Sequence, residues 1–225
     1  MSIEIKISLN QGLYKKDPQD SNLGRKIIQN SIILIYNEGF ECFNFKKLAK
    51  EINSTEASIY RYFENKHLLL TFLVNWYLEW VNYLIEINTL NLIEPEKKLR
   101  VIIHSFVSAS KENPSVAYVN ESILHKIVIS EAGKVYHTKN VDSENSKGFY
   151  SSYKKLVSTT SSVILEICPE FKYSNSLATN LFEMSNNHIY FAEHVPQLTD
   201  ISVEKNIANE LEVMLNHFAK KILSI

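Results

Sequence analysis

An all-α fold is predicted for this chain of 225 residues, and three features of the sequence indicate it. Apolar residues recur at spacings of three and four in one segment after another, as on the buried face of a helix. Pro95, Pro114, Pro169 and Pro196 fall between these segments, where helices begin or end. Within residues 43–66, two short amphipathic segments are separated by only a few residues, which is typical of a helix-turn-helix.

These patterns place each element along the chain. Residues 1–20 lack the periodicity and are expected to form a loose arm, and residues 132–144, which are polar and contain a glycine, are expected to form a loop. No segment requires a strand. The expected helices cover residues 22–38, 45–52, 55–62, 66–90, 95–112, 114–131, 145–168, 175–195 and 202–223.

The helix-turn-helix prediction depends on local signals. Asn44 is expected to cap the first short helix, whose buried side carries Phe45, Leu48, Ala49 and Ile52. Asn53 follows at a position where a chain leaving a helix commonly turns left-handed. Either Ser54 or Thr55 can then cap the second short helix, so the two helices must cross steeply.

The run from Gly39 to Leu69 resembles the DNA-binding end of the TetR (tetracycline-repressor-like) transcriptional regulators. The string SIYRYFENKHLLL carries the specific part, because Tyr-x-Tyr-Phe-x-x-Lys stands directly before a long apolar helix. The resemblance covers about the first third of the chain. It rests on the matching residues Gly39, Phe40, Asn44, Leu48, Ala49, Asn53, Ile59, Tyr60, Tyr62, Phe63 and Lys66.

The resemblance implies three domains: a loose N-terminal arm over 1–20, a three-helix helix-turn-helix DNA-binding domain over 21–66, and a helical ligand-binding and dimerisation domain over 67–225. It also implies a sequence-specific transcriptional regulator. A cytoplasmic protein is expected because the N-terminus lacks the apolar core of a secretory signal and no membrane span is predicted. In this prediction the protein is a repressor that a small apolar or aromatic effector releases from a double-stranded DNA operator. Whether regulation is negative or positive is left open by the residues.

Family positions that face DNA imply phosphate contacts for Asn44, Tyr60, Tyr62 and Lys66, and Lys46 is added as a DNA-binding residue. On the same basis Thr55, Glu56, Ser58 and Arg61 are expected to reach base edges. Three residues depart from the family pattern. Asn53 replaces the turn glycine, Ser54 replaces an apolar residue, and Glu56 repels phosphate, although it could accept from cytosine. Residues 22–66 hold seven cations and five anions, so the patch is only mildly basic.

A ligand pocket is predicted in the C-terminal two-thirds. Trp76, Trp80 and Tyr83 share one helical face, which is either a closed core or a pocket wall. Polar side chains that could contact a ligand there are His104, His125, Tyr153 and His188. His188 interrupts an apolar stripe and is the strongest of these candidates, although a satisfied core histidine fits the same pattern.

Two apolar stripes near 175–195 and 202–223 can pair across a two-fold axis into a four-helix bundle, and the resemblance implies a homodimer formed in this way. The alternative is that both stripes pack inside one subunit. The second stripe consists of Val203, Ile207, Leu211, Met214, Leu215, Phe218 and Ile222.

Enzymatic chemistry has little support in the sequence. Only five glycines occur, and no phosphate-binding loop or dinucleotide fingerprint can be written with them. No catalytic residue, metal site or cofactor is predicted, and no 18-residue apolar window free of charge offers a membrane span. Two alternatives stay open: a helical ligand- or protein-binding module that has lost DNA binding, and an uncharacterised all-helical enzyme.

Overall fold

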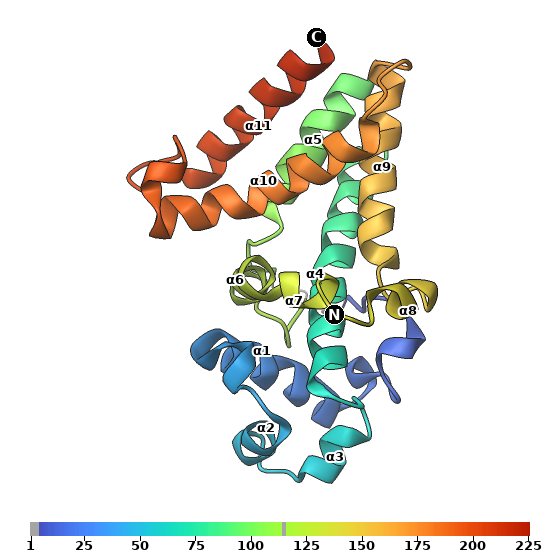
Figure 1. The fold of residues 1–225 in the computed structure, drawn as a ribbon, viewed down its shortest axis with the longest axis vertical. Coiled ribbons are helices and arrows are strands. Elements are labelled where there is room, and N and C mark those ends of the chain that lie inside the picture. Colours follow the sequence, from blue (N-terminus) through green and yellow to red (C-terminus); the bar gives the residue numbers. More distant parts are fainter. Residues whose placement is uncertain (1–4, 114–115) are drawn as a thin grey trace. The chain divides into compact units, whose positions relative to one another are not determined.

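The computed structural model describes residues 5–113 and 116–225, and these residues form helices joined by turns, with no strand among them (Figure 1). The predicted all-α fold is confirmed. The helices are η1 Gln11–Leu13, η2 Pro18–Asp20, α1 Asn22–Cys42, α2 Phe45–Glu51, α3 Glu56–Tyr60, α4 Lys66–Thr89, α5 Pro95–Ser108, α6 Glu121–Glu131, α7 Gly133–Tyr136, α8 Val141–Ser146, α9 Ser151–Ile167, α10 Ser174–His194, η3 Pro196–Leu198 and α11 Ile207–Leu223.

The chain divides into two compact units, and their boundary differs from the one expected at residue 66. The first unit comprises residues 1–80 and 110–152, and the second comprises 81–109 and 153–225. The short helices α2 and α3 therefore share a unit with the first part of α4 and with α6, α7 and α8. The physical reason is that α1 packs against both α2 and α6, so these elements have one core.

Helix α1 is regular up to Gly39, in agreement with the predicted end at residue 38. Gly39 has φ 77° and ψ 156°, a conformation open mainly to glycine, and the chain bends there before the last turn. Beyond the bend, the Glu131 carboxylate of α6 accepts from the Phe40 backbone N–H at 3.1 Å. Lys134 bridges the carboxylates of Glu131 and Glu41 at 2.7 and 3.0 Å, which fixes this end of α1 to α6.

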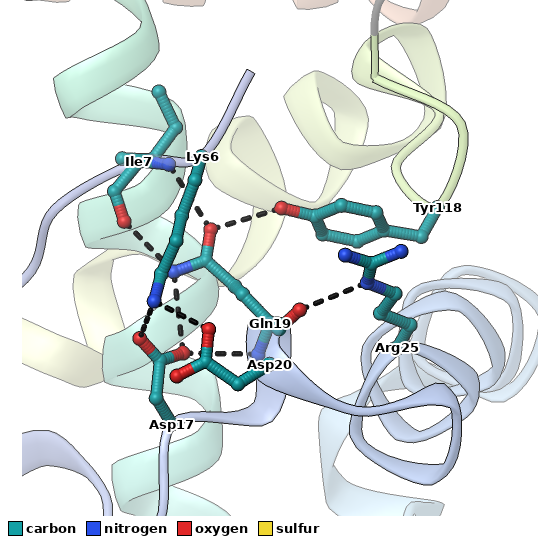
Figure 2. Close-up of polar contacts among 7 residues, drawn as sticks. All are labelled: Lys6, Ile7, Asp17, Gln19, Asp20, Arg25 and Tyr118. Carbon is teal, nitrogen blue, oxygen red and sulfur yellow. Dashed lines mark hydrogen bonds and ion pairs between the residues drawn. The ribbon is translucent and has the colours of Figure 1, made fainter. Parts of the chain in front are cut away.

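Residues 5–20, hereafter the arm, are packed, so the expectation of a loose arm was wrong for the part that the structure describes. Ile7, Leu9 and Leu13 are buried. The buried side-chain amide of Gln19 accepts from the Ile7 backbone N–H at 3.1 Å and donates to the Ile7 carbonyl at 2.7 Å (Figure 2). The arm has too few apolar residues to give a periodic signal in the sequence. It is nevertheless ordered, because one side-chain amide satisfies both backbone groups of Ile7.

The Gln19 contacts extend in two further directions. Its side-chain oxygen accepts from the Tyr118 hydroxyl at 2.9 Å, and its backbone carbonyl accepts from Arg25 Nε of α1 at 2.8 Å (Figure 2). The Arg25 guanidinium also lies over the Tyr118 ring at 5.4 Å from its centroid. We call this arrangement of Ile7, Gln19, Arg25 and Tyr118 the Gln19 latch.

The arm crosses α1 at Gly24. A β-carbon at this position would lie 2.1 Å from the backbone oxygen of Pro18, closer than any real contact. Glycine is therefore required for the close approach of η2 to α1, which gives the Gln19 latch its geometry.

In the second unit, α11 packs against both α5 and α10 (Figure 1). Its inward face carries Leu211, Leu215, Ala219 and Leu223, all of which are buried in the single chain. The last helix therefore contributes to a core within one subunit, and the predicted start at residue 202 moves to Ile207, which Asn206 caps.

Two other segments differ from their predicted form. The helix expected over 114–131 begins at Glu121, where the Asn120 side chain accepts from the Ile123 N–H at 2.8 Å; residues 114 and 115 lie outside the described part. The loop expected over 132–144 contains α7 and most of α8. Glu144 of α8 is buried, and it accepts from the Tyr150 hydroxyl at 2.7 Å and bonds His67 at 2.8 Å. This nonlocal bonding holds a polar segment in place.

Helix α4 is long and apolar enough in composition to cross a membrane, with a mean hydropathy of 1.3 in its most apolar window. However, 78% of that window is buried within the protein, as in the core helix of a globular fold.

Candidate functional site

The first helix of the helix-turn-helix has the predicted cap. Asn44 has extended backbone angles, and its side-chain oxygen accepts from the Lys47 N–H at 2.9 Å. Phe45, Leu48 and Ala49 are buried beneath α2, while its lysines point outward. Among these lysines, Lys46 is exposed and Lys47 pairs with Glu38 at 2.5 Å. Asn44 is therefore occupied as a cap, which fixes the direction in which the chain enters α2.

The turn between the two helices forms at Asn53, as predicted. Asn53 has φ 50°, and its N–H donates to the Lys50 carbonyl at 3.2 Å, while the Ser54 N–H donates to the Ala49 carbonyl at 2.8 Å. These two bonds with a left-handed residue form a Schellman motif, the arrangement that glycine usually adopts. Asn at this position therefore keeps the tight turn that a helix-turn-helix needs.

Three polar residues of α3 and its flanks are bonded to one another on an exposed face. The Thr55 hydroxyl accepts from the Ser58 N–H at 3.3 Å and lies 3.0 Å from the Ser58 hydroxyl. Arg61 Nη2 donates to the same Ser58 hydroxyl at 3.3 Å. Glu56 is exposed at the start of α3, between these residues. Three of the four side chains predicted to reach base edges, Thr55, Ser58 and Arg61, are thus held together.

Tyr60 combines a packed ring with an exposed surface. Its ring meets the Phe45 ring edge to face at 5.1 Å between centroids, and the residue is 46% exposed. This geometry joins α3 to α2 and leaves part of the tyrosine free to make a polar contact.

The structure gives Tyr62 and Lys66 roles other than the predicted phosphate contacts. Tyr62 is only 4% exposed, and its hydroxyl lies 2.8 Å from the Ser21 hydroxyl. The Lys66 ammonium donates to the carbonyls of Phe40, Glu41 and Phe43 at 3.0, 3.1 and 3.2 Å. An ammonium has three donors, so this set accounts for all of them. A lysine near the C-terminal end of a helix also interacts favourably with the helix dipole.

Two lysines of the arm contact Tyr62, which follows α3, and they were not predicted from the sequence. The Lys15 N–H donates to the Tyr62 carbonyl at 2.8 Å, and the Lys16 ammonium lies 5.4 Å from the centroid of the Tyr62 ring. Both lysines are exposed. The only sequence signal was the pair of adjacent lysines, and it gave no location because the fold of the arm depends on nonlocal contacts.

Three of the seven predicted ligand residues lie in the first unit, and all three are buried. Trp76 and Trp80 are 0% and 2% exposed and stack on one another at 6.2 Å between centroids. His125 is 3% exposed and stacks on Tyr77 at 5.2 Å. These contacts favour a closed core over a pocket wall for Trp76 and Trp80.

The other four predicted ligand residues belong to the second unit. Tyr83 is half-buried, the Tyr153 hydroxyl donates to Glu183, and His104 pairs with Glu212 at 2.9 Å. His188 Nδ1 lies 2.7 Å from the Thr199 hydroxyl, and burial lowers the pKa of the imidazole. His188 therefore fits a satisfied histidine, and the seven residues do not form one cluster within either unit.

Within the described residues, no group of three or more His, Cys, Asp or Glu side chains has the arrangement of a metal site.

A helix-turn-helix in front of a long central helix and further helices defines the class of fold found in TetR-like regulators. Comparison with solved structures agrees. A protein from Syntrophomonas wolfei assigned to the TetR family of transcriptional regulators matches with a TM-score of 0.66 and 16% identity, over 91% of this chain and 97% of that one. The fatty acid degradation regulator FadR from Bacillus halodurans matches with a TM-score of 0.60 and 15% identity, over 88% and 93%.

A third solved structure is AibR in complex with isovaleryl coenzyme A and operator DNA, with a TM-score of 0.59 and 16% identity, over 84% of this chain and 97% of that one. No protein-family model and no curated protein matches this chain. The likeness to these structures shows that the chain has the TetR-like fold.

Proposed function

We propose that this protein is a dimeric transcriptional regulator of the cytoplasm that binds a double-stranded DNA operator and responds to a small molecule. One observation carries the proposal. Exposed Thr55 and Arg61 are both bonded to half-buried Ser58, and this set is held at a tight Asn53 turn on a buried base, as a recognition helix requires. The similarity of the fold to that of AibR, whose structure contains operator DNA, supports the proposal.

DNA binding in this proposal has two parts. Arg61, Ser58 and Glu56 are assigned to base edges, because they lie on the exposed side of α3 and its C-terminal flank. Phosphate contacts are assigned to exposed Lys46 of α2 and to Lys15 and Lys16 of the arm, with Tyr60 at the edge. Cations positioned in this way supply affinity that depends on salt rather than on sequence.

The proposed dimer forms through α10 and α11. Val213, Phe218 and Ile222 of α11 are 62%, 38% and 48% exposed in the single chain, and Tyr190 of α10 is 40% exposed. Large apolar residues exposed on two neighbouring helices favour a self-complementary contact across a two-fold axis. A dimer of this kind reads two half-sites when its recognition helices are about 34–36 Å apart.

Small-molecule control follows from linkage. An effector that binds more tightly to a state with another spacing of the two recognition helices lowers the affinity for DNA by its differential affinity for the two states. We propose that the protein is a repressor, that the effector releases it from the operator, and that no enzymatic step is involved.

A second candidate function is a helical binding module without DNA affinity. Exposed Glu56 at the start of α3 favours it, since a carboxylate there repels phosphate. The test is fluorescence anisotropy of the full chain with labelled DNA from upstream of its own gene, and with duplexes selected from a random pool. Binding that survives competition by unrelated DNA supports the function as a transcriptional regulator. If no duplex is selected from the random pool, the function as a binding module without DNA affinity is favoured.

A further inference from the structure

A groove with a volume of about 530 Å³ runs along the middle of α1 in the first unit. Gln29, Ile32 and Ile33 of α1 form one side, and residues 112–113, 116–121 and 123 form the other. The volume lies within the range of about 300–1,000 Å³ typical of small-molecule sites. All of these described lining residues belong to the same compact unit.

The groove combines apolar walls with a buried carboxyl group. Glu121 lines it and is only 1% exposed. One of its oxygens accepts from the Asn113 N–H at 3.3 Å, but Oε1 is buried and has no hydrogen-bond partner among the described residues. A buried carboxylate oxygen without a donor is unfavourable, so a ligand that donates to it would gain what the free protein lacks.

The charge of the groove narrows the ligand class. Glu112 also lines it, and none of the described lining residues is a Lys, Arg or His. Burial raises the pKa of the Glu121 carboxyl group, and the nearby Glu112 carboxylate raises it further. Two carboxyl groups without a cation disfavour an anionic ligand, whereas the apolar side chains of Ile32 and Ile33 favour a ligand with a hydrocarbon portion.

We propose that this groove binds a small amphipathic amine, whose ammonium group donates to Glu121 and whose apolar portion lies against Ile32 and Ile33. The inference rests on the proposed function, in which such a molecule is the effector.

The position of the groove connects it with the helix-turn-helix. Tyr118 lines the groove and belongs to the Gln19 latch, which holds the N-terminal end of α1 through Arg25 (Figure 2). The other end of α1 is held by Glu131 and Lys66 through Phe40. A ligand beside Ile32 and Ile33 therefore contacts α1 between two fixed ends. Since α1 packs against α2, a change in α1 reaches the helix-turn-helix within one unit.

The experiment uses the full chain and two probes of similar shape and opposite charge, phenethylamine and 3-phenylpropionate. Saturation-transfer NMR detects binding, and calorimetry at millimolar probe measures affinity. The amine should bind at least tenfold more tightly than the acid. Glu121→Gln should weaken amine binding about tenfold or more. The matched control Glu170→Gln, at an exposed site in the second unit, should leave it unchanged.

A second variant keeps the test decisive if Glu121→Gln does not fold. Ile33 is 40% exposed, so Ile33→Trp can fill the groove and leave the core intact, and it should abolish amine binding. Equal affinity for amine and acid would overturn the proposal. So would unchanged amine affinity in the folded groove variants, or no binding of phenethylamine.

DNA binding is measured on the same samples. If the protein binds operator DNA but not the amine, the proposed ligand is wrong and the proposed regulator function stands. If it binds the amine but no DNA, the proposed regulator function is wrong and the amine site stands.

Discussion

The Lys66 ammonium nitrogen lies 3.0 Å from the carbonyl oxygen of Phe40 and 4.7 Å from the centroid of its ring. Together with the carbonyls of Glu41 and Phe43, this contact makes the first residue of α4 the cap of the last turn of α1. The lysine that resembled a phosphate contact in the sequence is therefore a link between two helices.

Lys66→Ala should accordingly lower the free energy of unfolding by about 1–3 kcal/mol, because three carbonyls lose a charged donor. The salt dependence of DNA binding should stay as in the wild type. Urea denaturation and anisotropy over a salt series measure the two quantities, with Lys172→Ala as the exposed control. Wild-type stability with a salt slope reduced by about one would restore the phosphate contact predicted from the sequence.

Lys16→Ala should reduce the slope of log affinity against log salt by about one, and should weaken binding to all sequences alike. The reason is that its ammonium lies over the ring of Tyr62, two residues after the end of α3. Arg61→Ala should in addition relax the preference at one base position, by about 1–3 kcal/mol of discrimination. Binding to a set of single-base operator variants separates the two effects. Identical sequence profiles for both variants would contradict the division between phosphate and base contacts.

Phe218→Glu and Leu211→Glu should have different consequences. Phe218 is 38% exposed, so a charge there should leave a folded monomer. Leu211 is 0% exposed within one chain, and a buried unpaired carboxylate should prevent folding. Sedimentation velocity and circular dichroism together report both results. A folded dimer of the Phe218 variant would place the interface on another surface.

Trp80→Ala should cost about 3–5 kcal/mol of stability, as for truncation of a large aromatic side chain in a closed core. Trp80 is 2% exposed and stacks on Trp76. Tyr173→Ala, which removes a 61% exposed ring, is the matched control and should have a small effect. If Trp80→Ala instead altered effector affinity at nearly wild-type melting temperature, the stripe would line a pocket.

His188 should make stability depend on pH. Burial lowers its folded-state pKa below the ordinary value of 6.5, although Asp200 opposes the shift. At pH values between the lowered folded-state pKa and 6.5, the unfolded chain binds more protons at this site than the folded one, so stability should fall as pH drops through 6.5. His188→Gln should remove part of this slope. Urea midpoints at several pH values measure it, and an unchanged slope would mean that His188 titrates alike in both states.

The local parts of the fold were predictable from the sequence. Asn44 and Thr55 as caps and Asn53 as the left-handed residue follow from the chemistry of their own side chains and near neighbours. The apolar periodicity likewise located most helices to within a few residues, because one buried face determines each of them.

The parts that were missed depend on residues far apart in the sequence. The arm is ordered by Gln19 and Tyr118, which are 99 residues apart, and α8 is anchored by His67 and Tyr150 through Glu144. Tyr62 and Lys66 have the residue types of phosphate contacts, but their burial and partners come from Ser21 and the end of α1. Residue type and spacing contain no information about such pairings.

Gly24 has a consequence for finding proteins of the same design. Because a β-carbon there would overlap Pro18, any chain whose N-terminal segment crosses its first helix in this way must keep glycine at the crossing. The glycine, the arginine directly after it and a glutamine five residues before it form a short signature, Gln-x4-Gly-Arg. A search with this signature, placed before a helix-turn-helix, would select relatives that share the anchored segment even where overall identity is too low to align.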